Sequence, residues 1–319
     1  MNATEQTILE QFSYWQQALE LDLNAVKLEP GLVAVIGCGT SYYLAQSIAA
    51  ALNQSPNHGA IAVPSGEWHL RRRSYIPATK VQVLALSRSG STSETVAAAK
   101  ASLDAGERVI GITCEPNSQL AKVSSSCVYA PTHPLEDIVM TTSASLMLLI
   151  GLAMAGQKIT SQQILEAQHL LEVHKNKLDS LIQNRSHFVY LGGGALYGIA
   201  SEGALKLMEM SLSFSQAYHP LEYRHGPISL IDERSLVVML YSPETLEQET
   251  KLVSELREKG AKVIGFGGAG DLSIQLSESL SLRGLIALPT LQWLGERVAQ
   301  SKGLNTREPR HLTKVVVLT

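Results

Sequence analysis

The feature that most restricts the fold of this chain is an internal repeat with a period of about 155 residues. The segment HFVYLGGGALYGIASEGALKLME repeats the layout of LVAVIGCGTSYYLAQSIAAAL, and LVVMLYSPETLEQETKLVSELREKGAKVIGF repeats VQVLALSRSGSTSETVAAAKASLDAGERVIGI. Gly37 and Gly192 are 155 positions apart (192 − 37), whereas Gly111 and Gly265 are 154 apart (265 − 111). Offsets that agree this closely indicate a tandem duplication of one folding unit.

Each copy alternates short apolar runs with helical patterns. Residues 32–37, 81–87 and 109–113 are continuous apolar runs, which are typical of strands covered on both faces. Helical patterns lie between them, and further helices are predicted for residues 5–28 and 144–156. This succession predicts an α/β fold in which each copy forms a parallel sheet with helices on both faces.

Length and repeat together predict two domains. A chain of 319 residues is expected to hold about two domains. We expect an N-terminal helix plus the first domain over residues 1–156, and a helical linker over 157–185. The second domain is expected over residues 186–319, including a C-terminal tail.

The composition excludes several classes of partner. Lys and Arg (26) nearly balance Asp and Glu (29), so no excess positive charge favours nucleic acid or an anionic membrane. The longest apolar run, residues 144–156, is shorter than the ~20 residues that span a bilayer. The three cysteines show no metal-ligand spacing, and the N-terminus has no apolar signal segment. We therefore expect a cytoplasmic protein without metal, nucleic acid or membrane partners.

A hydroxyl-rich loop follows the second strand of the first copy. Residues 87–93, SRSGSTS, contain five hydroxyl side chains at the opening of a helix. Backbone amides at a helix N-terminus and Ser or Thr hydroxyls together favour a small anion, above all a phosphate monoester. Simple capping of the helix is the alternative, although one hydroxyl suffices for that. The matching residues of the second copy, YSPE, have lost most of the hydroxyls.

The first loop, GCGTS at residues 37–41, also joins a strand to a helix. Its glycines allow a ligand to approach the backbone. The loop lacks the third glycine of a dinucleotide fingerprint, and no convincing acidic residue follows for a ribose. A nicotinamide cofactor is therefore disfavoured, and we expect no cofactor.

Ionisable side chains gather in the second copy. Glu202, Lys206 and Glu209 are spaced to share one stripe of a helix. An exposed ion-pair stripe is the alternative; apolar neighbours and the preceding glycines instead favour a largely buried helix, where such groups suit proton transfer. His225, in the segment EYRHGP, is a second candidate for proton transfer. Lys314, in a basic tail before an apolar end, is a candidate for a placed cation.

Six motifs in register make the chain resemble the sugar isomerase (SIS) family, in particular the isomerase half of glucosamine-6-phosphate synthase and its free-standing relatives. The motifs are GCGTSYY, SRSGSTSET, EDIVMTTSA, SEGALKLMEMS, AYHPLEYRHGPISLID and EPRHLTK. The resemblance implies two tandem flavodoxin-like SIS domains. The first is expected to bind phosphate, and the second is expected to be catalytic, with the C-terminal tail taking part in the active site. The resemblance also implies a homodimer whose active sites lie at the subunit interface, with the histidine reaching across.

The resemblance also assigns roles to single residues. It places the enolisation base at Glu209, the ring-opening histidine at His225 and the assisting lysines at Lys206 and Lys314. The resemblance implies phosphate-binding residues at Thr40, Ser41, Ser87, Arg88, Ser89, Thr92 and Val139. It implies residues that support the site at Gly39, Glu136, Glu202 and Glu222.

Three departures from the synthases separate this chain from them. Arg88 stands where they usually have glutamine, and Ser143 stands where they usually have lysine, which indicates a shifted sugar specificity. The chain begins Met1-Asn2 and enters the isomerase region directly, so we expect it not to draw ammonia from glutamine.

The resulting expectation is a deaminase that converts glucosamine 6-phosphate, or a related amino-sugar phosphate, into fructose 6-phosphate and ammonia. A fructosamine-6-phosphate deglycase or another phosphosugar isomerase is the enzymatic alternative. A non-catalytic phosphosugar sensor is the third possibility, but such a protein is expected to lose the Glu209 and His225 pair or to carry a DNA-binding domain.

Overall fold

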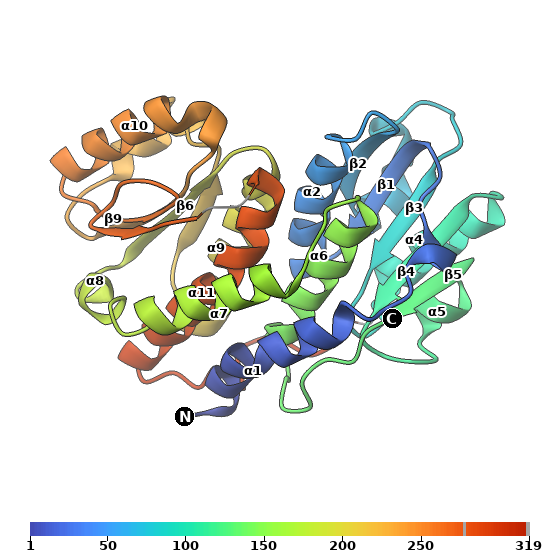
Figure 1. The fold of residues 1–319 in the computed structure, drawn as a ribbon, viewed down its shortest axis with the longest axis horizontal. Coiled ribbons are helices and arrows are strands. Elements are labelled where there is room, and N and C mark those ends of the chain that lie inside the picture. Colours follow the sequence, from blue (N-terminus) through green and yellow to red (C-terminus); the bar gives the residue numbers. More distant parts are fainter. Residues whose placement is uncertain (277–278, 317–319) are drawn as a thin grey trace. The chain divides into compact units, whose positions relative to one another are not determined.

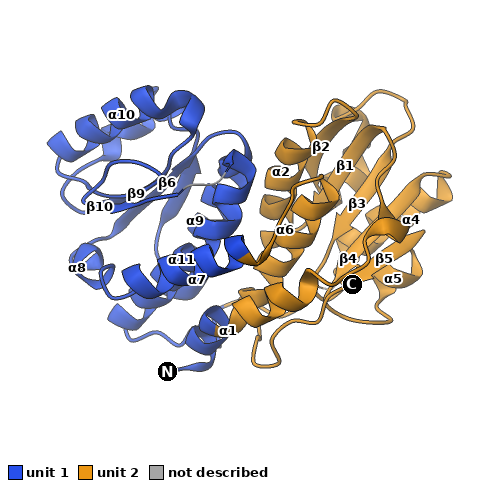
Figure 2. Ribbon diagram, in the orientation of Figure 1, with its two compact units in different colours: residues 1–9, 162–310 blue, residues 10–161, 311–319 orange. Residues whose placement is uncertain are grey.

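The computed structural model describes residues 1–276 and 279–316 and contains two compact units (Figures 1 and 2). We call them the N-terminal unit, residues 10–161 and 311–319 (orange in Figure 2), and the C-terminal unit, residues 1–9 and 162–310 (blue). Within the described residues, no helix has both the length and the apolar character needed to cross a membrane.

The N-terminal unit is a five-stranded parallel sheet in the order β2-β1-β3-β4-β5. The alternation of strands and helices along the chain is the one expected from the sequence. The elements are α1 (Ala3–Ala18, shared with the C-terminal unit), η1 (Asn24–Val26), β1 (Gly31–Gly37), α2 (Thr40–Leu52), β2 (His58–Pro64), α3 (Ser65–Arg71), η2 (Arg72–Ser74), β3 (Gln82–Leu86), α4 (Ser93–Asp104), β4 (Arg108–Thr113), α5 (Gln119–Lys122), β5 (Ser126–Tyr129) and α6 (Thr142–Met154).

The C-terminal unit holds a second five-stranded parallel sheet, in the order β10-β9-β8-β6-β7. When this order is read from β7, each strand takes the place of its counterpart in the other sheet. The elements are α7 (Ser161–His174), α8 (Asp179–Ile182), β6 (His187–Gly192), α9 (Ala195–Ser211), β7 (Ser215–Tyr218), η3 (Glu222–Arg224), η4 (Pro227–Leu230), β8 (Ser235–Leu240), η5 (Pro243–Thr245), α10 (Leu246–Glu258), β9 (Lys262–Phe266), β10 (Leu272–Ile274) and α11 (Leu280–Ser301).

Helices cover both faces of each sheet, which confirms the predicted fold class. In the N-terminal unit, one face packs Ala34, Ile36 and Val83 against Trp68 of α3 and Ala98 of α4. Helices α2 and α6 pack on each other. In the C-terminal unit α9 and α11 pack together, and α10 lies against the core that includes Val237 and Val263. The central strands are almost fully buried, which explains why they read as continuous apolar runs.

The backbone retains the duplication at the turn after the first strand of each copy. Gly39 has φ 53° and ψ −125°, and Gly194, 155 positions later, has φ 57° and ψ −127°. This region is accessible only to glycine, and in both copies the residue immediately precedes a helix, α2 or α9.

Contacts divide the chain differently from the boundaries expected from the sequence. Residues 311–316 pack in the N-terminal unit, although the sequence assigns them to the second domain, and residues 1–9 pack in the C-terminal unit. Each end of the chain therefore packs in the unit formed mainly by the other half of the sequence. The expected domain boundaries, 1–156, 157–185 and 186–319, stay a prediction.

Candidate active site

The two loops predicted to meet an anion lie side by side in the N-terminal unit. Strands β1 and β3 are hydrogen-bonded neighbours, and the chain leaves them in opposite directions along the sheet, toward β2 and β4. Parallel sheets bind ligands beyond the carboxyl ends of the strands at such a point. Thr95, near the start of the helix that follows the 87–93 loop, contacts the other loop, because its hydroxyl lies 3.6 Å from Cys38 Sγ. The same hydroxyl lies 3.0 Å from Ser65 Oγ at the start of α3.

The hydroxyls of the 87–93 loop do not serve simply to cap α4. Thr92 is the residue before the helix, but its side chain accepts no capping bond from the helix. Ser87 Oγ accepts from the Gly90 amide at 3.1 Å, and Ser89 Oγ accepts from the Ser91 amide at 3.2 Å, so these two hydroxyls shape the turn. Ser87 Oγ also donates to Thr92 Oγ1 at 3.4 Å. This arrangement favours anion binding over the capping alternative.

The second loop contributes the N-terminus of α2. Thr40 and Ser41 are its first two residues and both are buried, and Gly39 leaves the end of the helix without a capping side chain. The positive end of this helix dipole therefore lies beside the 87–93 loop.

A third segment, residues 136–141, lies against the same loop. The buried Glu136 carboxylate accepts from the amides of Thr141 and Ser143, both at 2.9 Å, and so caps α6. Val139 is buried in this segment. The Arg88 guanidinium donates to the carbonyls of Asp137 and Ile138, so the residue expected to contact phosphate has protein acceptors of its own.

The predicted cation Lys314 lies in the N-terminal unit with these loops. Its ammonium donates to the Glu136 carbonyl at 3.4 Å, and its own carbonyl accepts from Arg88 at 3.0 Å. The structure therefore brings Lys314 close to Arg88, to Glu136 and to the loop of residues 87–93, which we call the anion loop. The sequence placed Lys314 in the second domain and the others in the first.

In the C-terminal unit, the stripe on α9 is buried. Glu202 is 0% exposed and Lys206 1% exposed, which overturns the alternative of a solvated ion-pair face. The Lys206 ammonium donates to Glu209 Oε2 and lies 3.6 Å from Glu202 Oε1. Glu209, with a side chain 20% exposed, is the member of the stripe that solvent or a ligand reaches.

The close approach of α9 to the sheet depends on Gly203. A Cβ at this position would lie 2.7 Å from Cε1 of Tyr190 on β6. The glycine therefore lets α9 lie directly on β6. The neighbouring residues Glu202 and Lys206 of the same helix are buried.

Glu222 is the first residue of η3, and His225 directly follows η3 and precedes Gly226, whose φ is 137°. Both side chains are exposed. Among the described residues, no hydrogen bond or ion pair joins the His225 side chain to Glu209. The structure thus brings Lys206 to Glu209, as predicted, and leaves His225 open to solvent.

In the second copy, a buried carboxyl group binds the loop that corresponds to residues 87–93. Glu249 of α10, 1% exposed, accepts from the Ser242 amide and from Thr245 Oγ1, both at 2.8 Å. In the first copy the matching loop begins at Ser87. A carboxyl group of the protein itself therefore engages the loop of the second copy. That only the first copy is suited to an external anion stays a prediction.

Glu249→Gln is expected to gain stability relative to the natural protein as pH rises from 4.5 toward 7. Burial, the largest cause, raises the pKa of Glu249 above its usual 4.5, against the opposing effect of its hydrogen bonds. The folded state then binds more protons than the unfolded state above pH 4.5, so stability falls as pH rises through that window, and glutamine removes this loss. Urea unfolding of both proteins across this range measures the difference.

Glu255→Gln is the matched control for that experiment. The Arg224 guanidinium lowers the pKa of Glu255, so this carboxylate stabilises the folded state above pH 4.5 and loses that contribution as pH falls. Its difference curve should therefore be nearly flat well above pH 4.5 and should change only as pH falls below that value, with the opposite sign. Equal slopes for the two variants between pH 4.5 and 7 would contradict the assignment.

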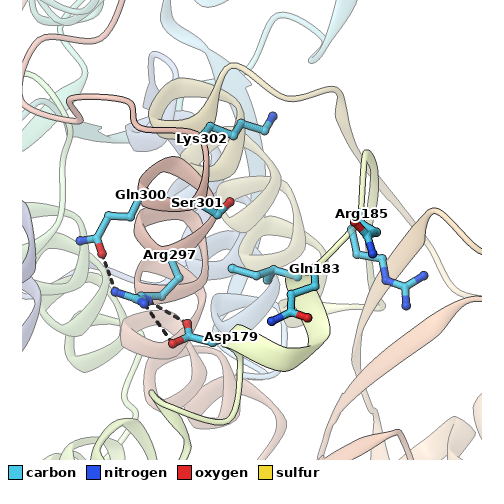
Figure 3. Close-up of a pocket in the computed structure, with 9 residues that line it drawn as sticks. Asp179, Gln183, Arg185, Arg297, Gln300, Ser301 and Lys302 are labelled. Carbon is cyan, nitrogen blue, oxygen red and sulfur yellow. Dashed lines mark hydrogen bonds and ion pairs between the residues drawn. The ribbon is translucent and has the colours of Figure 1, made fainter.

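Figure 3 shows a pocket of about 670 Å³ in the C-terminal unit, between α8 and the end of α11. Several of its polar side chains are engaged with one another or with neighbouring residues. Arg297 donates to both carboxylate oxygens of Asp179 at 2.8 and 2.9 Å, and Lys302 donates to Ser213 Oγ at 2.6 Å. None of the site residues expected from the sequence lines this pocket.

Thr95 is the site residue that sequence reasoning missed. It is fully buried three positions after Thr92, and its hydroxyl contacts Cys38 of the other loop. The sequence contained a signal for Thr95, because it follows the hydroxyl residues Thr92 and Ser93 in the first turn of α4. Side chains there tilt toward the N-terminus of the helix, and so toward the 87–93 loop. Within residues 1–276 and 279–316, no group of three or more His, Cys, Asp or Glu side chains has the arrangement of a metal site.

The two units define a class of α/β protein with two tandem domains, each a five-stranded parallel sheet flanked by helices. A family model described as "SIS domain" matches residues 30–155 and 180–284. The chain therefore belongs to the SIS family, and the predicted resemblance is confirmed.

Individual relatives agree with this family. The glutamine–fructose-6-phosphate aminotransferase (isomerizing) of Caldanaerobacter subterraneus subsp. tengcongensis is 26% identical over 90% of this chain and 52% of that protein. This chain thus spans about half the length of the curated relatives that it matches.

Two solved structures resemble the whole chain. The glucosamine-6-phosphate deaminase of Thermotoga maritima is 33% identical with a TM-score of 0.87, covering 99% of this chain and 100% of that one. The tagatose-6-phosphate ketose/aldose isomerase of Escherichia coli is 25% identical with a TM-score of 0.81, covering 95% and 93%. Together with the family match, these similarities indicate that the chain is an enzyme.

Proposed function

We propose that the chain is a phosphosugar isomerase that acts as a deaminase, converting glucosamine 6-phosphate and water into fructose 6-phosphate and ammonia. The observation that carries the proposal is the buried Lys206 ammonium held against the partly exposed Glu209 carboxylate on α9. Support comes from the similarity to a deaminase structure over nearly the full length of both chains.

The phosphate of the substrate is held by the first copy. Ser41, Ser87, Ser89 and Thr92 supply hydroxyls, and the N-termini of α2 and α4 supply amides and positive dipole ends. Thr40, Gly39 and Val139 line the approach. No cofactor takes part in this scheme.

Proton transfer is assigned to the second copy. His225 opens the sugar ring, and the Glu209 carboxylate removes the proton from C2 of the open-chain aldose. O1 takes a proton from solvent to give the enolamine, which the same carboxyl group protonates at C1. The nitrogen then releases one proton to solvent, which leaves a neutral imine at C2. Water adds to this imine and ammonia leaves, so atoms and charge balance. Lys206 and Lys314 provide positive charge near the developing oxyanion.

We further propose a homodimer in which His225 serves the partner subunit. The exposure of His225 supports this proposal, as do large apolar side chains exposed near Glu209 or His225 in the sequence. Phe214 is 89% exposed, and Met208, Leu212 and Leu230 also expose apolar surface. Exposed apolar surface of this kind is typical of a protein interface.

The test is release of ammonia and fructose 6-phosphate from glucosamine 6-phosphate by the purified protein, with galactosamine 6-phosphate as the second substrate. We expect both products in equal amounts. No ammonia from either amino sugar would overturn the deaminase assignment. Similarity to the ketose/aldose isomerase makes plain isomerisation the second candidate, which would appear as interconversion of tagatose 6-phosphate and its aldose without ammonia.

A further inference from the structure

Arg88 lies in the middle of the anion loop, but its side chain connects other parts of the N-terminal unit. The side chain is 7% exposed. One guanidinium nitrogen donates to the carbonyls of Asp137 at 2.6 Å and Ile138 at 3.1 Å, and the other donates to the carbonyl of Lys314 at 3.0 Å. A single side chain thus joins the anion loop, the segment before α6 and the C-terminal tail.

The backbone of Arg88 is fixed by two hydrogen bonds. Its carbonyl accepts from the Cys114 amide at 2.9 Å and from Thr113 Oγ1 at 3.1 Å, both at the end of the neighbouring strand β4. The buried Glu136 carboxylate lies 3.7 Å from the guanidinium and offsets its charge. The Arg88 side chain therefore extends from a fixed backbone position, and its charge is balanced by Glu136.

Between residues 311–316, the described part of the tail, and the neighbouring loops, few other hydrogen bonds are present. His311, Leu312, Thr313 and Lys314 are all exposed and lie outside any helix or strand. The remaining polar bonds from the tail to the loops are longer, at 3.4 Å, from the Lys314 ammonium to the Glu136 carbonyl and from the Ser93 amide to the Val316 carbonyl. The bond from Arg88 is the shortest of the three and the one made by a buried charged donor.

We propose that Arg88 is a positioning residue that sets Lys314 beside the anion loop by clasping its carbonyl. Arginine is required because its planar fork donates to carbonyls on two segments at once, whereas a lysine ammonium acts as a compact point charge. The role of Lys314 in catalysis rests on the proposed function, but the clasp itself does not.

Trypsin tests the clasp directly, because the Lys314 carbonyl belongs to the peptide bond that trypsin cuts after Lys314. Arg88→Lys keeps the positive charge opposite Glu136 and removes the fork, so it should fold. We expect its cleavage after Lys314 to be at least about tenfold faster, since cleavage follows the open population of the tail. Cleavage after the exposed Arg73 is the internal reference, and Arg88→Gln should behave like Arg88→Lys or show a larger effect.

Arg108→Lys is the matched control, because Arg108 in the same unit donates to the Lys27 carbonyl at 2.8 Å without touching the tail. It should leave cleavage after Lys314 unchanged. Wild-type cleavage in both Arg88 variants would overturn the proposal.

Turnover provides the second readout. If Arg88 acts through Lys314, Arg88→Lys and Lys314→Ala should each lower kcat, and the double variant should be no worse than Lys314→Ala alone. Additive losses would overturn the positioning role. A wild-type protein without activity on any sugar phosphate would refute the proposed function, while the trypsin experiment would still decide whether the clasp exists.

Discussion

Glu209→Gln is expected to lower kcat on glucosamine 6-phosphate by about 10²- to 10⁴-fold, the range typical of a lost general acid–base group. Glutamine keeps the size of the side chain and an oxygen for the Lys206 ammonium, but it cannot accept and return the C2 proton. The loss should therefore appear in kcat, with little change in the binding of inorganic phosphate, which depends on the other copy.

Exchange of the C2 proton of the substrate with solvent deuterium reports this step most directly, and the variant should lose the exchange. Glu172→Gln on α7, which removes a carboxylate from an exposed pair with Lys175, is the control and should remain fully active. If Glu209→Gln retained wild-type turnover on every sugar phosphate tried, Glu209 would not be the base.

Lys206→Met is expected to lower the free energy of unfolding by about 3–5 kcal/mol, because it removes the cation nearest to a fully buried carboxylate. Glu202 is 0% exposed with its Oε1 3.6 Å from the ammonium, so its charge would remain in the interior without this partner. Urea unfolding measures the loss without any assumption about the reaction.

A second substitution distinguishes the charge effect from lost packing. Adding Glu202→Gln to Lys206→Met removes the buried charge as well and should recover a large part of the stability. Lys175→Met, in the exposed pair with Glu172, should change stability by no more than about 0.5 kcal/mol. An equal loss in Lys175→Met and Lys206→Met would contradict this account.

Central strands could be read from the sequence, but edge strands could not. The burial of β1, β3, β6 and β8 produces the apolar runs that predict them. The edge strands β2, β5, β7 and β10 pair on one side only and have mixed burial, so their residues lack a continuous apolar pattern.

The N-terminal helix was predicted too long. The sequence indicates a helix over residues 5–28, whereas α1 ends at Ala18 and a short turn of helix follows at residues 24–26. The Asp22 carboxylate accepts from the Asn24 amide and side chain, a local turn that competes with continuing the helix. The buried helix expected over residues 144–156 is confirmed as α6.

The repeat of about 155 residues determined most of the architecture by itself, because two sequences with the same strand, turn and helix pattern form the same local structure. Gly39 and Gly194 are the physical basis of that equivalence at the turns. Local pattern also singled out the 87–93 loop as a candidate anion site and Glu202, Lys206 and Glu209 as one stripe of a helix, since both depend on neighbours in sequence.

Only the tertiary structure decided which charges are buried and which distant segments meet. The spacing of Glu202, Lys206 and Glu209 fits an exposed or an enclosed face equally well, and packing against the sheet made it enclosed. Arg88 and Lys314 are 226 residues apart, and no periodicity relates them. Their contact arises because the Arg88 side chain is buried and its guanidinium must find hydrogen-bond acceptors, and the Lys314 carbonyl of the tail is one of them.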